Sequence, residues 1–219
     1  MAIAGDTYLP EGSKSNLIIV EGPKGVGKTT TTNWLREQIA FSNLYRLSGP
    51  REKGQSGKFH AHSLHHQTLK YIDSLHTLNM THILDRTFFS EYVYCELGYK
   101  PYSFRRDTEE LCAQLASMHC RFNILVLSLS LHDTSLYQNR LGRAKGAYLE
   151  QYKPENIKID YSIEQQHAYE LLFRWVDQKY NCPKPKMPVF HVLTDDEASS
   201  HAILAFTVNS ITGQKLITN

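Results

Sequence analysis

One stretch of the sequence has the glycines, the lysine and the threonine of a phosphate-binding loop. It reads Gly22-Pro23-Lys24-Gly25-Val26-Gly27-Lys28-Thr29 and matches the pattern G-x-x-x-x-G-K-[ST]. In such a loop the glycines let backbone N–H groups turn toward phosphate oxygens, the lysine reaches the β- and γ-phosphates, and the hydroxyl binds Mg²⁺. The motif therefore predicts ATP and Mg²⁺ as cofactors. Its candidate nucleotide-binding residues are Gly22, Lys24, Gly25, Val26, Gly27, Lys28, Thr29 and Thr30.

The loop lies between a predicted strand and a predicted helix, which is the context that the motif requires. Asn16–Val20 is a short apolar run rich in β-branched residues, as in a central parallel strand that is buried on both faces. From Lys28 to about Ala40 the apolar residues follow a helical stripe. We expect this helix to add the positive end of its dipole to the phosphate site.

A second candidate site follows the predicted strand Thr81–Leu84. Asp85 and Arg86 come directly after it, so their side chains would emerge at the carboxyl edge of the sheet, where α/β proteins bind their ligands. Asp85 would hold a magnesium-bound water or act as base toward an acceptor. Arg86 would bind an anionic acceptor or the transferring phosphoryl group. The alternative for the pair is an exposed ion pair that caps the next helix.

Basic residues gather in segment 138–153, after a predicted strand over 123–130. Arg140 and Arg143, with Lys145 beside them, would close over the phosphates as a lid and stabilise charge in the transition state. The alternative is a solvated basic helix face, which charge runs commonly are.

The remaining predicted elements alternate between helix and strand, which indicates an α/β fold with a mostly parallel sheet flanked by helices. At 219 residues the chain is the size of one domain, which we place at 15–219 after a flexible lead over 1–14. We predict a loop at 48–58, further helices at about 60–78, 89–97, 107–119, 162–180 and 198–211, and further strands at 44–47 and 189–193.

Composition excludes several classes of protein. The net charge of +2 gives no excess of positive field for gripping nucleic acid. The four cysteines have no CxxC spacing, which indicates reduced thiols and not a zinc site or a disulfide frame. No apolar run approaches the ~20 residues of a membrane-spanning helix, and the N-terminus has no signal pattern. We expect a cytoplasmic protein without membrane association.

Together these motifs resemble the thymidylate kinase-like branch of the P-loop kinases, which also contains the deoxynucleoside kinases. The resemblance runs from about Leu17 to the final helix. Residues 85–94 are similar to the family's Asp-Arg-aromatic element, with its following serine and tyrosine, and the basic segment is similar to its lid. The resemblance implies a three-layer P-loop kinase fold with a short basic lid.

The resemblance also implies where an acceptor binds. Of the aromatic residues after Arg86, we expect Phe88 and Tyr94 to face the cleft and Phe89 and Tyr92 to lie in the core. The acceptor site would be lined by Arg51, Phe59, Arg86, Phe88, Ser90, Glu91 and Tyr94.

The sequence departs from the thymidylate kinase pattern at two places. Lys24 stands where those enzymes usually carry an acid that faces the acceptor sugar. The arginine that clamps the acceptor's phosphate is missing after Phe59, where this chain has several histidines, and Arg51 or Lys53 would replace it. We interpret those histidines, which are His60, His62, His65 and His66, as acceptor contacts or plain surface and not as a metal site.

We therefore expect ATP-dependent phosphoryl transfer to a deoxynucleoside monophosphate, a pyrimidine one of the thymidylate type. The alternatives are a deoxynucleoside kinase, a kinase of a hydroxymethylated base in DNA, and a nucleotide-dependent switch that is no enzyme. The expected partners are a nucleotide substrate and a second copy of the chain in a homodimer. A nucleic-acid partner is expected only if the substrate is a hydroxymethylated base in DNA.

Overall fold

The computed structural model describes residues 14–49, 54–144, 159–181, 184 and 186–212. Its strands are β1 (Ser15–Glu21), β2 (Ser42–Arg46), β3 (Thr81–Asp85), β4 (Phe122–Ser130) and β5 (Val189–Leu193). Its helices are α1 (Lys28–Gln38), α2 (Gly54–Ser74), α3 (Phe88–Glu96), α4 (Arg105–Ser117), α5 (Leu136–Ala144), α6 (Asp160–Tyr180) and α7 (Glu197–Thr212). Short 3₁₀ turns follow α2 at His76–Leu78 and α4 at Met118–Cys120.

The strands form one parallel sheet in the order β2-β3-β1-β4-β5. The first strand is therefore central, with Ile18 opposite Ile83 of β3 and Leu125 of β4. From β1 the chain goes to β2 at one edge of the sheet, returns to β3, and then crosses to β4 and β5 on the other side, so the carboxyl end of β1 is a point where the strand order reverses. Open α/β sheets bind their ligands at such a point.

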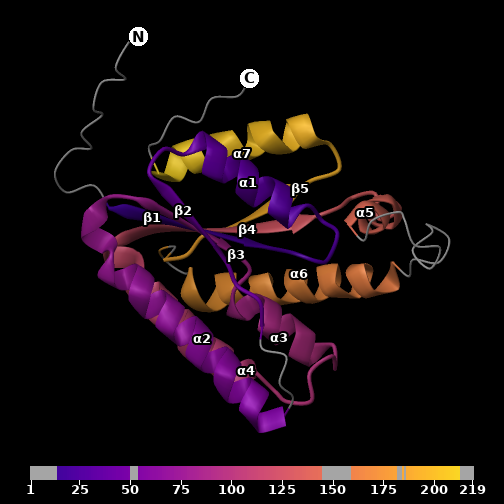
Figure 1. The fold of residues 1–219 in the computed structure, drawn as a ribbon, viewed down its shortest axis with the longest axis horizontal. Helices are drawn as coiled ribbons and strands as arrows, with labels where there is room; N and C mark the ends of the chain where they lie inside the picture. The colour runs from indigo at the N-terminus through magenta and orange to yellow at the C-terminus, as the bar shows by residue number, and fades with distance from the viewer. Residues whose placement is uncertain (1–13, 50–53, 145–158, 182–183, 185, 213–219) are drawn as a thin grey trace.

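Helices cover both faces of the sheet, which gives the three layers that we predict. The side chains of β1 alternate between two cores: Leu17 and Ile19 pack toward α2, α3, α4 and α6, whereas Ile18 and Val20 pack toward α1, α5 and α7. Figure 1 shows α1 and α7 on one face of the sheet and α2, α3, α4 and α6 on the other. Each of these four side chains is fully buried, and each such burial stabilises the fold by roughly 1.5–3 kcal/mol.

The observed elements follow the predicted ones closely except at the start of α2 and at α5, which forms where we predict only a basic lid segment. We predict a polar loop over 48–58, whereas the helix begins at Gly54. The buried stripe of α2 begins at Gly57 and continues through Ala61 and His65. Glycine and histidine are not counted as apolar residues, so a search for apolar periodicity does not detect the first turns of α2. No helix in the described part of the chain is long and apolar enough to cross a membrane.

Candidate active site

The phosphate loop connects β1 to α1 and is shaped by two glycines that no other residue could replace without strain. A Cβ on Gly22 would lie 2.5 Å from the backbone oxygen of Leu129 in β4, so this position needs a bare backbone. Gly27 caps the N-terminus of α1 with φ at +105°, a conformation that L side chains rarely adopt. The loop therefore passes close to β4 and delivers Lys28 to the first turn of the helix.

Lys28 is buried, and its ammonium points back into its own loop. Nζ donates to the carbonyl oxygens of Gly22 and, at 2.6 Å, of Pro23. Burial and the nearby Arg86 guanidinium lower the pKa of Lys28 to about 7, against the opposing charges of Glu21 and Asp85. A triphosphate offers the same ammonium anionic oxygens in place of carbonyls, and such acceptors favour its charged form.

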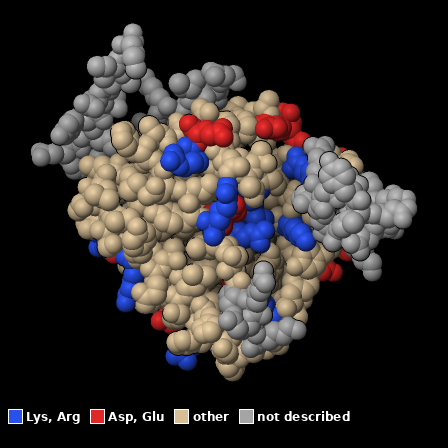
Figure 2. All heavy atoms as spheres, in the orientation of Figure 1, with Lys and Arg blue, Asp and Glu red and all other residues tan. Residues whose placement is uncertain are grey.

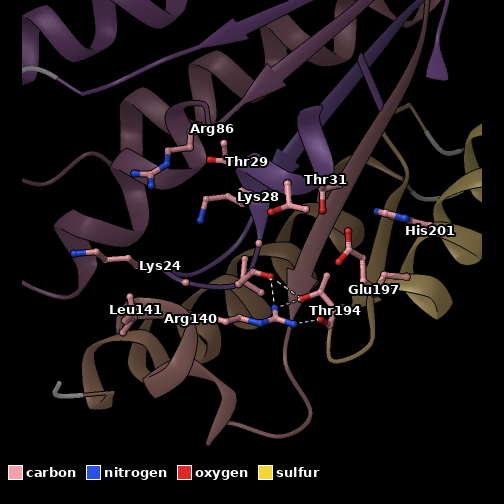
Figure 3. Close-up of a pocket in the computed structure, with 15 residues that line it drawn as sticks. Lys24, Lys28, Thr29, Thr31, Arg86, Arg140, Leu141, Thr194, Glu197 and His201 are labelled. Carbon is pink, nitrogen blue, oxygen red and sulfur yellow. Dashed lines mark hydrogen bonds between the residues drawn. The ribbon is translucent and has the colours of Figure 1, made fainter. Parts of the chain in front are cut away.

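A pocket of about 560 Å³ opens over this loop, and we call it the loop pocket. Figure 3 shows Lys28, Lys24 and Arg86 on one side of it and Glu197 and His201 on the other. Figure 2 shows Lys and Arg side chains gathered near the centre of the face of the molecule that it draws. Of the eight predicted nucleotide-binding residues, Gly22 does not line the pocket, and the other seven do: Lys24, Gly25, Val26, Gly27, Lys28, Thr29 and Thr30.

The far wall of the loop pocket comes from residues that sequence reasoning missed, namely Thr194, Glu197, Ser200 and His201. Thr194 directly follows β5, so it lies at the same carboxyl edge of the sheet as the phosphate loop. Its position directly after a predicted strand is the sequence feature that could have identified Thr194 as a site residue. The ring of His201 also stacks on Trp34 of α1, with ring centres 4.4 Å apart.

Arg140 lines the loop pocket but is already engaged with the backbone. Nη1 donates to the carbonyl oxygen of Val26 at 2.9 Å, and Nη2 donates to that of Thr194. The Thr194 hydroxyl donates to the same Val26 oxygen at 2.6 Å. Arg140 thus connects the phosphate loop to the segment after β5. It positions the loop, and it also places a positive charge at the wall of the loop pocket.

We expect Arg140→Ala to weaken nucleotide binding and the fold together. Hydrogen bonds to a charged group contribute about 1.5–3 kcal/mol, so the free energy of unfolding should fall by about that amount. The Kd for ATP should rise at the same time. Denaturant unfolding and calorimetric titration measure the two effects, and a variant with an unchanged Kd for ATP would contradict the positioning role.

Thr29 and Asp85 are the residues that we predict at a magnesium ion. Thr29 lies in the first turn of α1 and lines the loop pocket. Asp85 is buried beside α1, where its Oδ2 accepts from the Thr32 hydroxyl at 3.5 Å and pairs with Arg46 at 3.7 Å. Because Mg²⁺ is commonly held by one or two side chains together with substrate phosphates and water, a hydroxyl and a nearby carboxylate fit an ion that arrives with the nucleotide.

Other metal sites and the base role of Asp85 find less support. Among the described residues, no group of three or more His, Cys, Asp or Glu side chains could hold a metal ion. Asp85 lines neither the loop pocket nor the second pocket described below. Its buried carboxylate, which pairs with the largely exposed Arg46, indicates that it supports the site from behind.

Glu21, at the end of β1, organises the segment after β3. One carboxylate oxygen accepts from the backbone N–H and the hydroxyl of Thr87, and the other accepts from Ser90 and Tyr169. Burial raises the pKa of Glu21. Ser90, which we predict at the acceptor, therefore donates to Glu21. The sequence feature that could have identified Glu21 is an acidic side chain between an apolar strand and the glycine loop.

Arg86 occupies the turn between β3 and α3 in a left-handed conformation, with φ at +74°. Its backbone N–H donates to Val20 at 3.1 Å, and its guanidinium donates to the Tyr94 hydroxyl at 3.2 Å. A non-glycine residue with this φ costs energy and is kept where the surroundings enforce it. Here the turn presents the Arg86 side chain to the loop pocket.

Arg86 also lines a second, smaller hollow of about 170 Å³, which we call the side pocket. The two pockets therefore meet at this side chain. Of the predicted acceptor residues, Arg86, Ser90, Glu91 and Tyr94 line the side pocket. Its other lining residues are Leu47, Gly49, His65, Thr87 and Lys100.

Two predicted acceptor residues lie elsewhere. Phe88 is 1% exposed and packs in the core against Phe89 and His65, so its assignment to the cleft is wrong. Phe59 is 69% exposed and lines neither pocket. On α2 it lies two residues from Gly57 and Ala61 of the buried stripe, and a two-residue step turns a helix by about 200°.

Several predicted cations fall outside the described residues. Arg51 and Lys53 lie in the segment 50–53, and Lys145 and the rest of the expected lid lie in 145–158. The backbone of Arg143 belongs to the last turn of α5, and its side chain is outside the described part. Their roles remain predictions.

His65 contributes a neutral imidazole to the side pocket. It is 4% exposed, its Nδ1 has no hydrogen-bond partner, and burial, with a smaller effect of His62, lowers its pKa to about 4. An uncharged ring cannot replace the missing arginine clamp. The histidine of α2 that reaches the side pocket is therefore no phosphate-binding cation.

The same pKa predicts how stability depends on pH. Between pH 6.5 and about 4 an unfolded chain protonates this histidine while the folded chain does not, so stability should fall as the pH drops through that range. At 1.36 kcal/mol per pKa unit, His65 should contribute up to roughly 3 kcal/mol of this loss. Urea unfolding of wild type and His65→Leu at pH 7.5 and 4.5 measures it. Equal losses in the two proteins would contradict the assignment.

By sequence the chain matches no family model and no curated protein. By structure it is similar to a deoxyadenosine kinase from M. mycoides with bound dCTP, at a TM-score of 0.53 and 16% identity, over 89% of this chain and all of that one. A thymidylate kinase from Candida albicans is similar at a TM-score of 0.55 and 14% identity, over 94% of this chain and 96% of that one. The fold is that of the P-loop kinases.

Polyphosphate kinase 2 from Arthrobacter aurescens TC1 has the same P-loop kinase fold, at a TM-score of 0.60 and 12% identity, over 95% of this chain and 72% of that one. The three-layer P-loop kinase fold that the sequence predicts is thereby confirmed. At these identities the likeness concerns the fold, so the reaction has to be argued from the site itself.

Proposed function

We propose that the chain transfers the γ-phosphoryl group of ATP to a deoxynucleoside monophosphate, a pyrimidine one of the thymidylate type, with Mg²⁺. The observation that carries this proposal is the meeting of two pockets at Arg86. A phosphoryl transfer needs a donor site and an acceptor site that join where the group moves, whereas a switch needs the nucleotide site alone.

The residues of the loop pocket suit the donor. Backbone N–H groups of the glycine loop and the N-terminus of α1 would hold the β- and γ-phosphates, and Lys28 would leave its carbonyl partners for them. Thr29 would hold Mg²⁺ together with the phosphates, Asp85 would orient a magnesium-bound water, and the ion would supply charge neutralisation. Arg86 would stabilise the charge that develops on the group in transfer.

The side pocket suits the acceptor. Its volume of about 170 Å³ is large enough to hold a nucleobase. Arg86, at the junction of the two pockets, would meet an acceptor phosphate. Similarity to a thymidylate kinase fold is in keeping with this reading.

A deoxynucleoside kinase is the second candidate. It is favoured by the neutral His65 on the helix where a phosphate clamp is expected and by the similarity to a deoxyadenosine kinase fold. The switch is disfavoured because the sequence has no Asn-Lys-x-Asp element for reading guanine. A kinase of bases within DNA is disfavoured by the net charge of +2.

An acceptor panel tests the proposal. The purified protein receives ATP and Mg²⁺ with each deoxynucleoside, each monophosphate, or a DNA oligomer carrying hydroxymethylated bases, and ADP formation is measured. We expect a pyrimidine monophosphate to be used best. Better use of a nucleoside would establish the second candidate, and slow hydrolysis that no acceptor accelerates would establish the switch.

A further inference from the structure

A buried carboxylate faces the side pocket from α3. Glu91 is 3% exposed, its Oε1 accepts from the Tyr102 hydroxyl, and the same oxygen lies 3.3 Å from Nζ of Lys100. Burying a charged pair costs several kcal/mol per ion and is often no better for stability than apolar packing. A carboxylate kept at the wall of a pocket is therefore a candidate for recognising what enters the pocket.

The backbone opposite Glu91 is built to leave room for this carboxylate. A Cβ on Gly49 would lie 2.7 Å from Oε2 of Glu91, closer than real Cβ contacts allow. Gly49 is not among the glycines with positive φ, so its backbone conformation does not itself require glycine. The bare backbone of Gly49 therefore lets the Glu91 carboxylate stay at the wall of the side pocket, whereas a side chain at position 49 would displace it.

The charges around the side pocket orient an acceptor within it. Arg86 is a cation at the junction with the loop pocket, whereas Glu91 and Lys100 form an ion pair and His65 adds a neutral ring. A phosphate next to Glu91 would be repelled, so the acceptor's phosphate belongs at Arg86. The uncharged end of the acceptor then meets Glu91 and Lys100.

We propose that Glu91 and Lys100 read the hydrogen-bonding edge of a keto pyrimidine. The carboxylate accepts from the ring N3–H, and the ammonium donates to the adjacent carbonyl oxygen. This inference rests on the proposed function, because it assigns the substrate's base to the side pocket. A site that hydrogen-bonds a substrate N–H discriminates strongly against an analogue without it, since the buried group then loses its partner.

The test compares thymidine monophosphate with its N3-methyl analogue, which has lost the donor. Wild type should use the analogue at least about a hundredfold less efficiently in kcat/KM. In Glu91→Gln the acceptor KM should rise about ten- to a hundredfold, the KM for ATP should stay unchanged, and the discrimination against the N3-methyl analogue should shrink.

Tyr102→Phe is the matched control, because Tyr102 contacts the carboxylate without lining the side pocket. It should lower the melting temperature and keep the discrimination. If Glu91→Gln does not fold, Gly49→Ala serves as the second variant. It places a methyl group against Oε2 of Glu91 and should therefore raise the acceptor KM.

Equal use of the two monophosphates by wild type would overturn the inference, as would a preference for a cytosine nucleotide. A third outcome would also overturn the inference: if Glu91→Gln lost discrimination against a 3′-deoxy acceptor and kept discrimination against the N3-methyl analogue, Glu91 would contact the sugar and not the base. These failures differ from failure of the proposed function, in which wild type uses a nucleoside better than any monophosphate or phosphorylates no acceptor of the panel.

Discussion

Turnover of Lys28→Ala should fall by on the order of 10²–10³, because one preorganised charge aimed at the transferring group is lost. The fold should survive, since the buried ammonium is held only by two carbonyl oxygens of its own loop. Removing it also relieves the cost of burying a cation beside Arg86. Single-turnover transfer from ATP and a thermal melt measure the two expectations.

Lys70→Ala is the matched control for Lys28. Lys70 is an exposed residue of α2 and lines neither pocket, so its loss should change turnover by less than twofold. Near wild-type turnover in Lys28→Ala would remove the assignment of the glycine loop to the donor phosphates. A melt that collapses in Lys28→Ala but not in Lys28→Met would instead assign the lysine to packing.

Arg86→Ala should have a comparable effect, with turnover lower by ~10²–10³ and the preference for a monophosphate over its parent nucleoside erased. The reason is its position at the junction, where one guanidinium serves both the group in transfer and the acceptor phosphate. Steady-state kinetics with each acceptor in turn measure both parts. Retention of the preference would place the acceptor phosphate on another cation.

Two controls separate charge from shape at Arg86. Arg46→Ala removes an arginine that pairs with Asp85 from a largely exposed position, and it should leave acceptor preference intact. Tyr94→Phe removes the hydroxyl that holds the Arg86 guanidinium, so it should lower turnover by a smaller factor. If Arg46→Ala matched Arg86→Ala, the effect would come from disturbing Asp85.

The sequence predicts the fold well where a local pattern coincides with burial. The apolar run before Gly22 and the helical stripe after Lys28 are such patterns, and both elements form as predicted. The parallel order follows from the alternation of strands and helices. The early start of α2 could not be predicted, because its first buried residue is Gly57, whose burial reflects close packing and not hydrophobicity.

The candidate site shows a similar division. Arg86, which directly follows β3, and Lys28, which ends the glycine loop after β1, are predictable because the end of a strand or a sequence motif fixes where they emerge. Phe88 and Tyr94 could not be told apart, since both are aromatic and lie on one short helix, and only tertiary packing sends Phe88 into the core. Glu91 was predicted at the acceptor, but its partners Lys100 and Tyr102 lie beyond the motif.

The contacts on Val26 also bear on how the chain acquires its ligand during synthesis. The phosphate loop lies near the start of the chain, yet its carbonyl at Val26 is held by Arg140 and Thr194, which follow 114 and 168 residues later. A nascent chain that has emerged only as far as β4 has the glycine loop without these restraints. We therefore expect ribosome-bound chains to retain ATP only after β5 and Thr194 have left the exit tunnel, so nucleotide binding would report that β5 has joined the sheet.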